Sequence, residues 1–222
     1  AISIRLVGSE MCIRDSAARV VAATGGSTNA ALHLPAIANE AGLKFTLRDV
    51  VEIYNSTPYI GDMQPGGKYV AKDLYDVGGV PVVIKSLLDG GYINGDCITV
   101  TGKTIAENHK EVIFPTNQDV VYKCDNPISE NSSVVGLWGN LAPDGCISKI
   151  AGLKNLTFKG KAKCFDSEED ALTAVLKNEI KAGDAVIIRY EGPKGGPGMR
   201  EMLSTTGAIY GQGLGETVAL IT

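Results

Sequence analysis

The spacing of the apolar residues changes near Cys97, and this change limits the possible folds more than any other feature of the sequence. Before Cys97, apolar residues recur at helical spacing between breaks such as the glycine pairs at residues 25–26 and 78–79. Beyond residues 97–101, which read as a strand, short β-rich apolar runs dominate. The sequence therefore predicts an α/β protein with a mainly helical first half and a second half of short strands.

The helical half carries local signals for where its helices begin and bend. Ser27 is expected to cap a helix that runs to Glu40. Pro35 is expected either to kink that helix or to mark its first turn. Thr46 and Asp49 have the spacing of a capping box, with Asp in the position usually held by Glu, and they predict a further short helix.

The second half contains five short β-rich runs, interrupted by one helix that Ser167 is expected to cap. The runs are residues 133–138, 146–150, 160–165, 185–190 and 217–222. Several short strands with few helices predict a compact β-barrel or sandwich that carries helices. Because the last run reaches Thr222, we expect this domain to be truncated.

The pattern divides the chain into four parts. They are a foreign or disordered segment at residues 1–16, a domain at residues 17–114, a linker at residues 115–132 and a second domain at residues 133–222. The first part lacks both helical and strand periodicity, and the linker is polar and lacks an apolar period. We therefore expect two domains joined by a short polar connection.

Composition and charge argue against several classes of protein. The net charge is −4 and the basic residues form no stripe, so no nucleic-acid partner is expected. The longest apolar runs fall far short of the ~20 residues that a membrane span requires. The cysteines are odd in number and contain no C-x-x-C pair, which argues against a disulfide framework and favours a reducing, cytoplasmic compartment.

Two glycine motifs resemble nucleotide-binding loops, and their spacing argues against both readings. Residues 102–104 resemble the end of a P-loop, but Cys97 stands where that motif needs a glycine, so an ordinary strand-to-helix turn is favoured. In residues 211–215 the dinucleotide-binding pattern is incomplete, because Glu216 occupies the place of the third glycine. A tight turn is the favoured interpretation there.

Residues 25–29 precede a helix, and their backbone amides could hold an anion at the positive end of its dipole. Simple capping by Ser27 is the favoured alternative. His33 lies one turn into that helix without an obvious partner, so a structural role is favoured over that of a catalytic base. The cysteines could be cluster ligands, but their surroundings favour small buried residues. They are Cys12, Cys97, Cys124, Cys146 and Cys164.

Glu201 is the strongest candidate for a functional side chain. It ends the glycine-rich segment at residues 192–201, which holds four glycines and two prolines and is therefore predicted to be a loop. The loop follows the apolar run at residues 185–190 and leads into a helix-like run at residues 202–209. A glutamate in the first turn of a helix is also favoured by the helix dipole alone, so spacing leaves both readings open.

Four separated stretches together resemble the family of dihydroxy-acid and sugar-acid dehydratases. They are residues 25–30, 96–104, 139–145 and 189–199. The resemblance extends from about Ala17 to Thr222 and implies an N-terminal α/β domain followed by a swivelling β-barrel (β/β/α) domain, here truncated. It also implies a hydro-lyase that converts 2,3-dihydroxy carboxylic acids to 2-keto acids, with an iron–sulfur cluster (2Fe–2S or 4Fe–4S) and Mg²⁺ as cofactors.

The resemblance assigns one residue of this chain to the site, because Glu201 matches the carboxylate that the family supplies to magnesium. The cysteines of the cluster are expected upstream of Ala17, and the serine that serves as the base is expected beyond Thr222. No catalytic or cluster-binding residue is therefore expected in this chain, which we interpret as an inactive internal fragment of a homodimeric enzyme.

Three functions follow from these observations. The first is dehydration of a 2,3-dihydroxy-3-methyl acid in branched-chain amino acid biosynthesis, and the second is dehydration of a sugar acid such as gluconate or 6-phosphogluconate. The third, from a different class, is a non-catalytic binding module that uses the glycine-rich loop as its surface.

Overall fold

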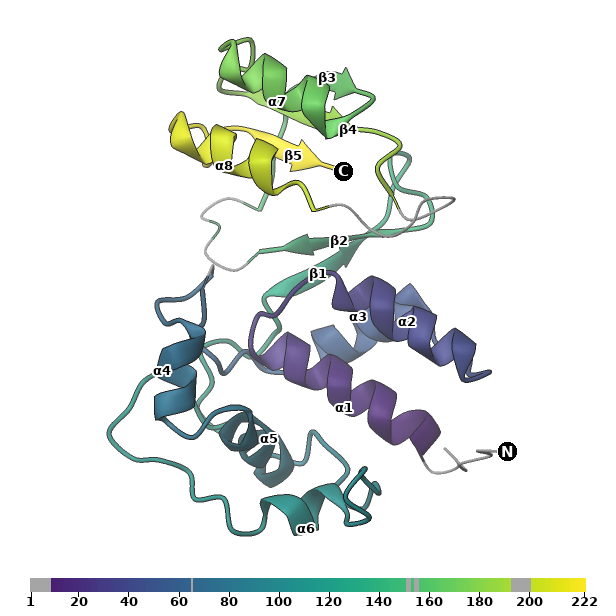
Figure 1. Cartoon of the computed structure of the whole chain (residues 1–222), viewed down its shortest axis with the longest axis vertical. Helices are drawn as coiled ribbons and strands as arrows, with labels where there is room; N and C mark the ends of the chain where they lie inside the picture. The colour runs from purple at the N-terminus through teal and green to yellow at the C-terminus, as the bar shows by residue number, and fades with distance from the viewer. Residues whose placement is uncertain (1–8, 65, 151–152, 154–155, 193–200) are drawn as a thin grey trace. The chain divides into compact units, whose positions relative to one another are not determined.

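The computed structural model describes residues 9–64, 66–150, 153, 156–192 and 201–222 as a mixed α/β chain (Figure 1). The contacts divide it into two compact units, residues 1–152 and residues 153–222. None of the helices within the described ranges is long and apolar enough to cross a membrane. The mixed α/β class expected from the sequence is confirmed.

The first unit contains six helices and one pair of strands in its described part. These are α1 (Ser9–Ala23), α2 (Ala30–Glu40), α3 (Leu47–Asn55), α4 (Ala71–Asp76), α5 (Val80–Asp89), α6 (Ile105–His109), β1 (Val134–Leu137) and β2 (Cys146–Lys149). The two strands are antiparallel, with Val134 opposite Lys149. Helix α3 contacts both α1 and β1 (Figure 1).

Helix α1 contributes small residues to two separate apolar cores of the first unit. Ala18 and Ala22 are fully buried in a core with Val50, Tyr54 and other residues of α2, α3 and β1. Ala23 is fully buried in a second core, which includes residues of α5 such as Val83. Short side chains allow neighbouring backbones to approach closely, so the alanines of α1 fit its position between α3 and α5.

The beginning of α1 corrects one prediction. The helix starts at Ser9, so the expectation of disorder was wrong for residues 9–16. Residues 1–8 lie outside the described residues, and a foreign origin of the segment stays a prediction. Two other local expectations for this unit, the cap at Ser27 and the strand at residues 97–101, were wrong as well.

Ser27 does not cap α2, because the helix begins at Ala30 after Asn29, and the Ser27 hydroxyl oxygen accepts from the Asn29 amide at 3.2 Å. Pro35 lies inside α2 and not in its first turn. Proline has no amide hydrogen, so one helical hydrogen bond is absent at that point.

Residues 97–101 do not form a strand, since only an isolated bridge joins Ile98 to Thr104. The Thr99 amide donates to the Lys103 carbonyl at 2.8 Å across a turn, and Thr104 then caps α6. By contrast, the predicted capping box of α3 is confirmed, because the Thr46 amide donates to Asp49 Oδ2 at 2.7 Å.

The predicted linker, residues 115–132, pairs with residues 59–62 of the first unit. The Tyr59 amide donates to the Ser129 carbonyl and the Asp62 amide donates to the Val120 carbonyl, each at 2.9 Å. A connecting role between two domains stays a prediction for this segment.

The second unit is a three-stranded parallel sheet with two helices. Its elements are β3 (Lys161–Phe165), α7 (Glu168–Leu176), β4 (Asp184–Ile188), α8 (Leu203–Gly211) and β5 (Ala219–Ile221). The strand order is β3-β4-β5, and both neighbouring pairs are parallel. Helices α7 and α8 pack against each other, and the core beneath them includes Val175, Val186 and Ile209.

All five β-rich runs expected from the sequence contain a strand, and Ser167 caps α7 by accepting from the Asp170 amide at 3.2 Å. The arrangement differs from the expected barrel or sandwich within the described residues, because β1 and β2 form a separate pair and β3–β5 form an open parallel sheet. Parallel strands need crossover helices, and α7 and α8 take that role.

Candidate functional site

Glu201 lies two positions before the first residue of α8, directly after the part of the glycine-rich segment that lies outside the described residues. Its side chain is exposed, whereas the next residue, Met202, is 7% exposed and packs in the core of the second unit. Met202 therefore anchors the start of α8 and leaves the carboxylate of Glu201 outside the core.

The predicted place of Glu201 needs a small correction. The sequence suggested that it opens the helix, but Met202 is the N-cap and the first turn of α8 contains no acidic residue. The effect of a helix dipole falls off within the first turn. Glu201 lies one position before the N-cap, close to the positive end of α8, so the explanation by the helix dipole stays open.

The beginning of α7 holds both ends of the glycine-rich segment. Before the segment, Glu191 Oε1 accepts from the Glu168 amide at 2.9 Å. After it, the Thr205 amide donates to Glu168 Oε1 at 3.3 Å, and the Thr205 hydroxyl donates to the Glu168 carbonyl at 3.5 Å. Glu168 is only 6% exposed. One buried residue thus connects the chain on both sides of the segment that ends on Glu201.

The backbone turns sharply where β4 passes into this segment. Tyr190 has a φ of 65°, a left-handed conformation that is uncommon for a bulky residue. The guanidinium of Arg189 lies 5.1 Å from the centre of the Tyr190 ring and is paired with Asp166 at 2.5 Å. The Arg189–Asp166 ion pair joins the residue after β4 to the residue before the cap of α7, next to the contact of Glu191 with Glu168.

Glu201 is the residue that the sequence analysis singled out as a ligand of magnesium. No group of three or more His, Cys, Asp or Glu side chains is arranged to hold a metal within the part of the chain that the structure describes. Mg²⁺ is usually bound through one or two carboxylates together with water and substrate oxygens. The exposed carboxylate of Glu201 is of the ligand type that Mg²⁺ prefers.

Among the described side chains, the cysteines form no group that could hold an iron–sulfur cluster, which needs several thiolates at one place. Cys97 is buried, as expected for a small apolar residue. Burial raises the pKa of the Cys124 thiol, which lies 3.6 Å from Ser86 Oγ. Cys146 and Cys164 are exposed, so the prediction of small buried residues was wrong for these two.

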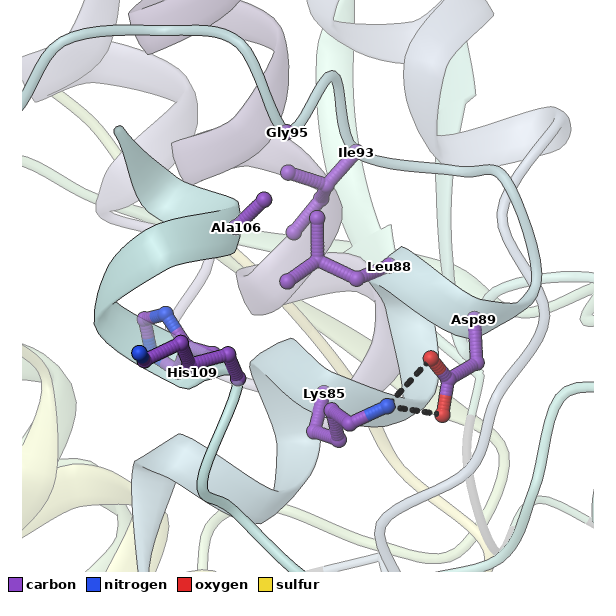
Figure 2. A pocket seen from close by; sticks show the side chains of 8 residues that line it. Lys85, Leu88, Asp89, Ile93, Gly95, Ala106 and His109 are labelled. Atoms are coloured by element: carbon purple, nitrogen blue, oxygen red, sulfur yellow. Dashed lines mark hydrogen bonds and ion pairs between the residues drawn. The ribbon is translucent and has the colours of Figure 1, made fainter.

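Neither histidine lies in a catalytic arrangement. His33 is exposed on α2. His109 Nδ1 is 2.7 Å from the Ile105 carbonyl oxygen, beside a pocket of about 340 Å³ between α5 and α6 (Figure 2). In that pocket Lys85 pairs with Asp89 at 2.5 Å. The charges of Lys85 and Asp89 thus neutralise each other. The sequence had not indicated this pocket.

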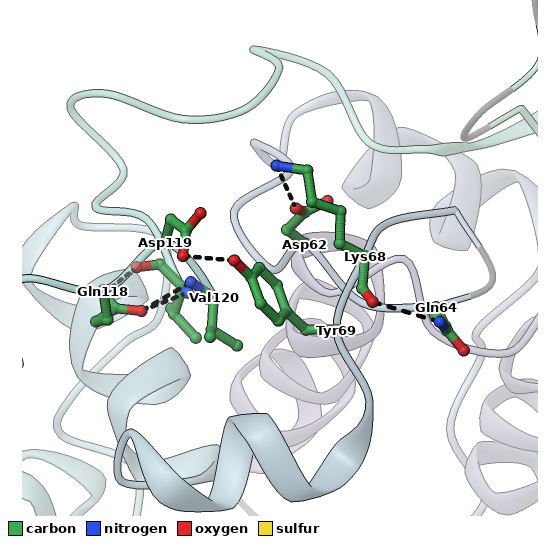
Figure 3. Close-up of polar contacts among 8 residues, drawn as sticks. Asp62, Gln64, Lys68, Tyr69, Gln118, Asp119 and Val120 are labelled. Carbon is green, nitrogen blue, oxygen red and sulfur yellow. Dashed lines mark hydrogen bonds and ion pairs between the residues drawn. The ribbon is translucent and has the colours of Figure 1, made fainter.

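Two polar contacts lie close together beside Tyr69, and one of them reaches the predicted linker (Figure 3). The Tyr69 hydroxyl donates to Asp119 Oδ1 at 2.5 Å, and this hydrogen bond raises the pKa of Tyr69 to about 12. In the second contact, Lys68 Nζ lies 3.6 Å from Asp62 Oδ2. Asp119 is thus paired with Tyr69 and Asp62 with Lys68, and we interpret both contacts as structural.

Sequence reasoning missed one cluster in the first unit. Tyr59, Ser133 and Lys149 each contact Gly25, although only residues 25–29 had been singled out. These side chains come from segments far apart in the chain, and no local spacing could have indicated that they meet.

Two family models match the chain. The model of the dihydroxy-acid/6-phosphogluconate dehydratase N-terminal domain matches residues 8–108, and that of the C-terminal domain matches residues 119–222. The gap between the two matches ends inside the predicted linker.

Curated relatives agree with these matches. Dihydroxy-acid dehydratase of Pelagibacter ubique is 66% identical over 208 residues, and dihydroxy-acid dehydratase 2 of Bradyrhizobium diazoefficiens is 62% identical over 208 residues. The dihydroxy-acid dehydratase of Parvibaculum lavamentivorans is 61% identical over 210 residues. Each comparison covers 94% of this chain and 36% of the relative, so the chain spans little more than a third of their length. The chain belongs to the dihydroxy-acid/6-phosphogluconate dehydratase family.

Proposed function

We propose that the protein containing this chain is a hydro-lyase that dehydrates 2,3-dihydroxy-3-methyl carboxylic acids to 2-keto acids in valine, isoleucine and leucine biosynthesis. The observation that carries the proposal is the 66% identity, over 94% of the chain, to a relative named dihydroxy-acid dehydratase. A sugar-acid dehydratase is the second candidate, because the matching family models include 6-phosphogluconate dehydratases.

Within that reaction, Glu201 supplies one carboxylate ligand to magnesium. Its exposed side chain and its anchored neighbour Met202 support this role, since a hard cation prefers a fixed oxygen donor. When bound, Mg²⁺ would act as a Lewis acid that polarises the oxygens of the substrate. The task of this chain is to hold the Glu201 carboxylate in position through the contacts of α7 and α8.

The remaining cofactor and the base belong to other parts of the protein in this proposal. The described cysteines are not grouped, which supports cluster thiolates outside this chain. The base serine is likewise proposed to lie outside it. We further propose that the whole protein is a cytoplasmic homodimer. Its substrate is a small dihydroxy acid.

The finer domain organisation is also a proposal. Residues 17–114 would belong to the N-terminal α/β domain, residues 115–132 to the linker, and residues 133–222 to the swivelling β-barrel domain. The start of the C-terminal family match at residue 119 supports a boundary in that region.

The test compares two substrates. The whole protein, purified with its cofactors, is incubated with 2,3-dihydroxyisovalerate or with 6-phosphogluconate, and the keto acid formed is measured. Turnover of the first acid alone supports the proposal, and turnover of the second alone supports the sugar-acid candidate. Turnover of neither would favour a non-catalytic binding module.

The chain of 222 residues by itself is expected to form no keto acid, even after reconstitution with iron, sulfide and magnesium. It lacks a cluster site among its described residues, and the expected base is not part of it. Clear turnover by the isolated chain would contradict the proposal that the cluster thiolates and the base lie outside it.

A further inference from the structure

Helix α8, which begins shortly after Glu201, has no side-chain cap of its own. Its N-cap residue is Met202, whose side chain packs in the core and makes no capping hydrogen bond. The first amides of a helix have no partner within the helix and are usually satisfied by a side-chain oxygen of the N-cap residue. The start of α8 therefore needs an acceptor from another part of the chain.

Glu168 of α7 supplies that acceptor. Thr205 is the third residue of α8, a position whose amide a capping side chain usually binds. This amide donates to Glu168 Oε1 at 3.3 Å, and the Thr205 hydroxyl donates to the Glu168 carbonyl at 3.5 Å. Thr205 is fully buried, and Glu168 is nearly so. Glu168 thus caps α8 from a neighbouring helix, in place of Met202.

The inward direction of the Glu168 side chain is not explained by its own helix. A carboxylate in the first turn of α7 is favoured by the helix dipole, but Glu169 and Asp170 meet that preference from exposed positions. Burying an ionised carboxylate costs free energy unless hydrogen bonds compensate. The bond from Thr205 gives Glu168 a reason to be buried, and it serves α8.

Helix α7 is a fixed support for this contact. Ser167 caps α7 by accepting from the Asp170 amide, and α7 contacts both β3 and β4. Near the other end of the two helices, Gln212 Nε2 donates to the Val175 carbonyl at 2.6 Å. Helix α8 is thus tied to α7 near both of its ends, and Glu168 makes the tie nearer to Glu201.

We propose that Glu168 is a positioning residue that fixes the Glu201 carboxylate through the first turn of α8. Glu201 lies directly before the N-cap of α8, so a displacement of this turn would move its carboxylate. Mg²⁺ demands a nearly ideal octahedral arrangement of oxygen ligands, and a displaced ligand would therefore bind it less well. This role rests on the proposed function, since it requires Glu201 to be a ligand of magnesium.

The first measurement concerns the hydrogen bond itself. Hydrogen–deuterium exchange of the peptide that contains Thr205 is followed by mass spectrometry on the whole protein without magnesium. Glu168→Ala should speed up the exchange, whereas Glu168→Gln keeps the length of the side chain and an acceptor oxygen and should leave the exchange slow. Glu201→Gln should leave it slow as well. Unchanged exchange in Glu168→Ala would overturn the proposed positioning.

The second measurement is the magnesium midpoint, the Mg²⁺ concentration that gives half of the maximal rate of keto-acid formation by the whole protein. We expect Glu168→Ala to raise the midpoint about threefold to tenfold, because one hydrogen bond is lost, and Glu168→Gln to raise it less than about twofold. The double variant with Glu168→Ala and Glu201→Gln should behave as Glu201→Gln alone, because Glu168 acts through Glu201. A further loss in the double variant would overturn the proposed positioning.

Glu168→Asp keeps the charge but shortens the side chain by one methylene group. It should raise the magnesium midpoint as Glu168→Ala does, and it replaces that variant if the alanine protein fails to fold. An unchanged midpoint in Glu168→Asp would show that the charge near α8, and not the contact with Thr205, is what matters.

Val175→Ala is the matched control, because it removes part of a fully buried side chain from the same helix. It should lower the thermal stability of the protein and leave the magnesium midpoint unchanged. An equal rise of the midpoint in Val175→Ala and Glu168→Ala would reduce the effect to a general loosening and refute the positioning.

The same titrations separate this role from the proposed function. An unchanged midpoint in Glu201→Gln would refute the magnesium role of Glu201 and the positioning by Glu168 together. A raised midpoint or a lost rate in Glu201→Gln, with an unchanged midpoint in Glu168→Ala, would refute the positioning alone.

Discussion

Glu191 Oε1 accepts a hydrogen bond from the backbone amide of Glu168 at 2.9 Å, which places a carboxylate at the N-terminus of α7. The amides at the start of a helix have no partner within the helix, and a negative charge is favoured there. Because Thr205 contacts the same Glu168 from the other side, this bond helps to close the segment that leads to Glu201.

Replacing Glu191 with alanine should loosen the start of α7. We expect Glu191→Ala to lower the free energy of unfolding by about 0.5–2 kcal/mol, the usual range for loss of a side-chain cap. The Glu168 amide should also exchange its hydrogen faster. Urea denaturation and amide exchange measure the two effects. Glu216→Ala, at an exposed glutamate of the same unit, should change neither, and an unaltered Glu168 amide in Glu191→Ala would refute the contact.

Gly25 and Gly42 both have a positive φ, and comparing alanine substitutions at the two positions separates the cost of backbone strain from the cost of a steric clash. Gly25 has a φ of 60° and Gly42 a φ of 74°, but only Gly25 has neighbours within 4 Å of an added Cβ. Gly42→Ala should cost about 1–2 kcal/mol of unfolding free energy from the left-handed backbone alone.

Gly25→Ala should cost a further ~1–3 kcal/mol, because the new methyl group would overlap with Ser133 and the Tyr59 ring. Urea denaturation followed by the fluorescence of Trp138 measures the difference within the first unit. Equal losses for the two substitutions would show that the packing around Gly25 is looser than described.

The phenol of Tyr69 should resist ionisation until high pH. Its hydrogen bond to Asp119 raises its pKa to about 12, so the contribution of this bond to stability is fully present below the unfolded pKa of about 10. That contribution is lost as the pH rises through about 12. Asp119→Asn should bring the pKa down toward the ordinary value. Absorbance titration of the tyrosines measures it, with Tyr69→Phe to identify the signal, and identical titrations before and after Asp119→Asn would contradict the prediction.

Local signals predicted the elements well where a single stretch decides the structure. The capping box of Thr46 and Asp49 and the cap at Ser167 are confirmed because each depends on residues three positions apart. The strand predicted at residues 97–101 failed for the opposite reason. β-branched residues favour a strand only when a partner strand is available, and here the chain turns back on itself and leads into α6.

Contacts between distant segments could not be predicted from spacing. The five β-rich runs gave no indication that β3, β4 and β5 pair in parallel, because the order of strands depends on how α7 and α8 cross over. The meeting of Tyr59 and Ser133 beside Gly25 likewise arises only from the fold. Glu201 was found because glycines, prolines and a carboxylate stand together in ten residues, and its role as a metal ligand stays a prediction.

We propose that Glu201 holds magnesium in a dihydroxy-acid dehydratase. The most direct measurement is the rate of keto-acid formation from 2,3-dihydroxyisovalerate by the whole protein over a magnesium titration, with Glu201 and with Glu201→Gln. Glutamine keeps the size of the side chain and removes its charge. We predict that the substitution abolishes the magnesium-dependent rate or shifts its midpoint upward by at least about tenfold, since a charged ligand is lost. An unchanged rate and an unchanged magnesium midpoint in Glu201→Gln would contradict the claim.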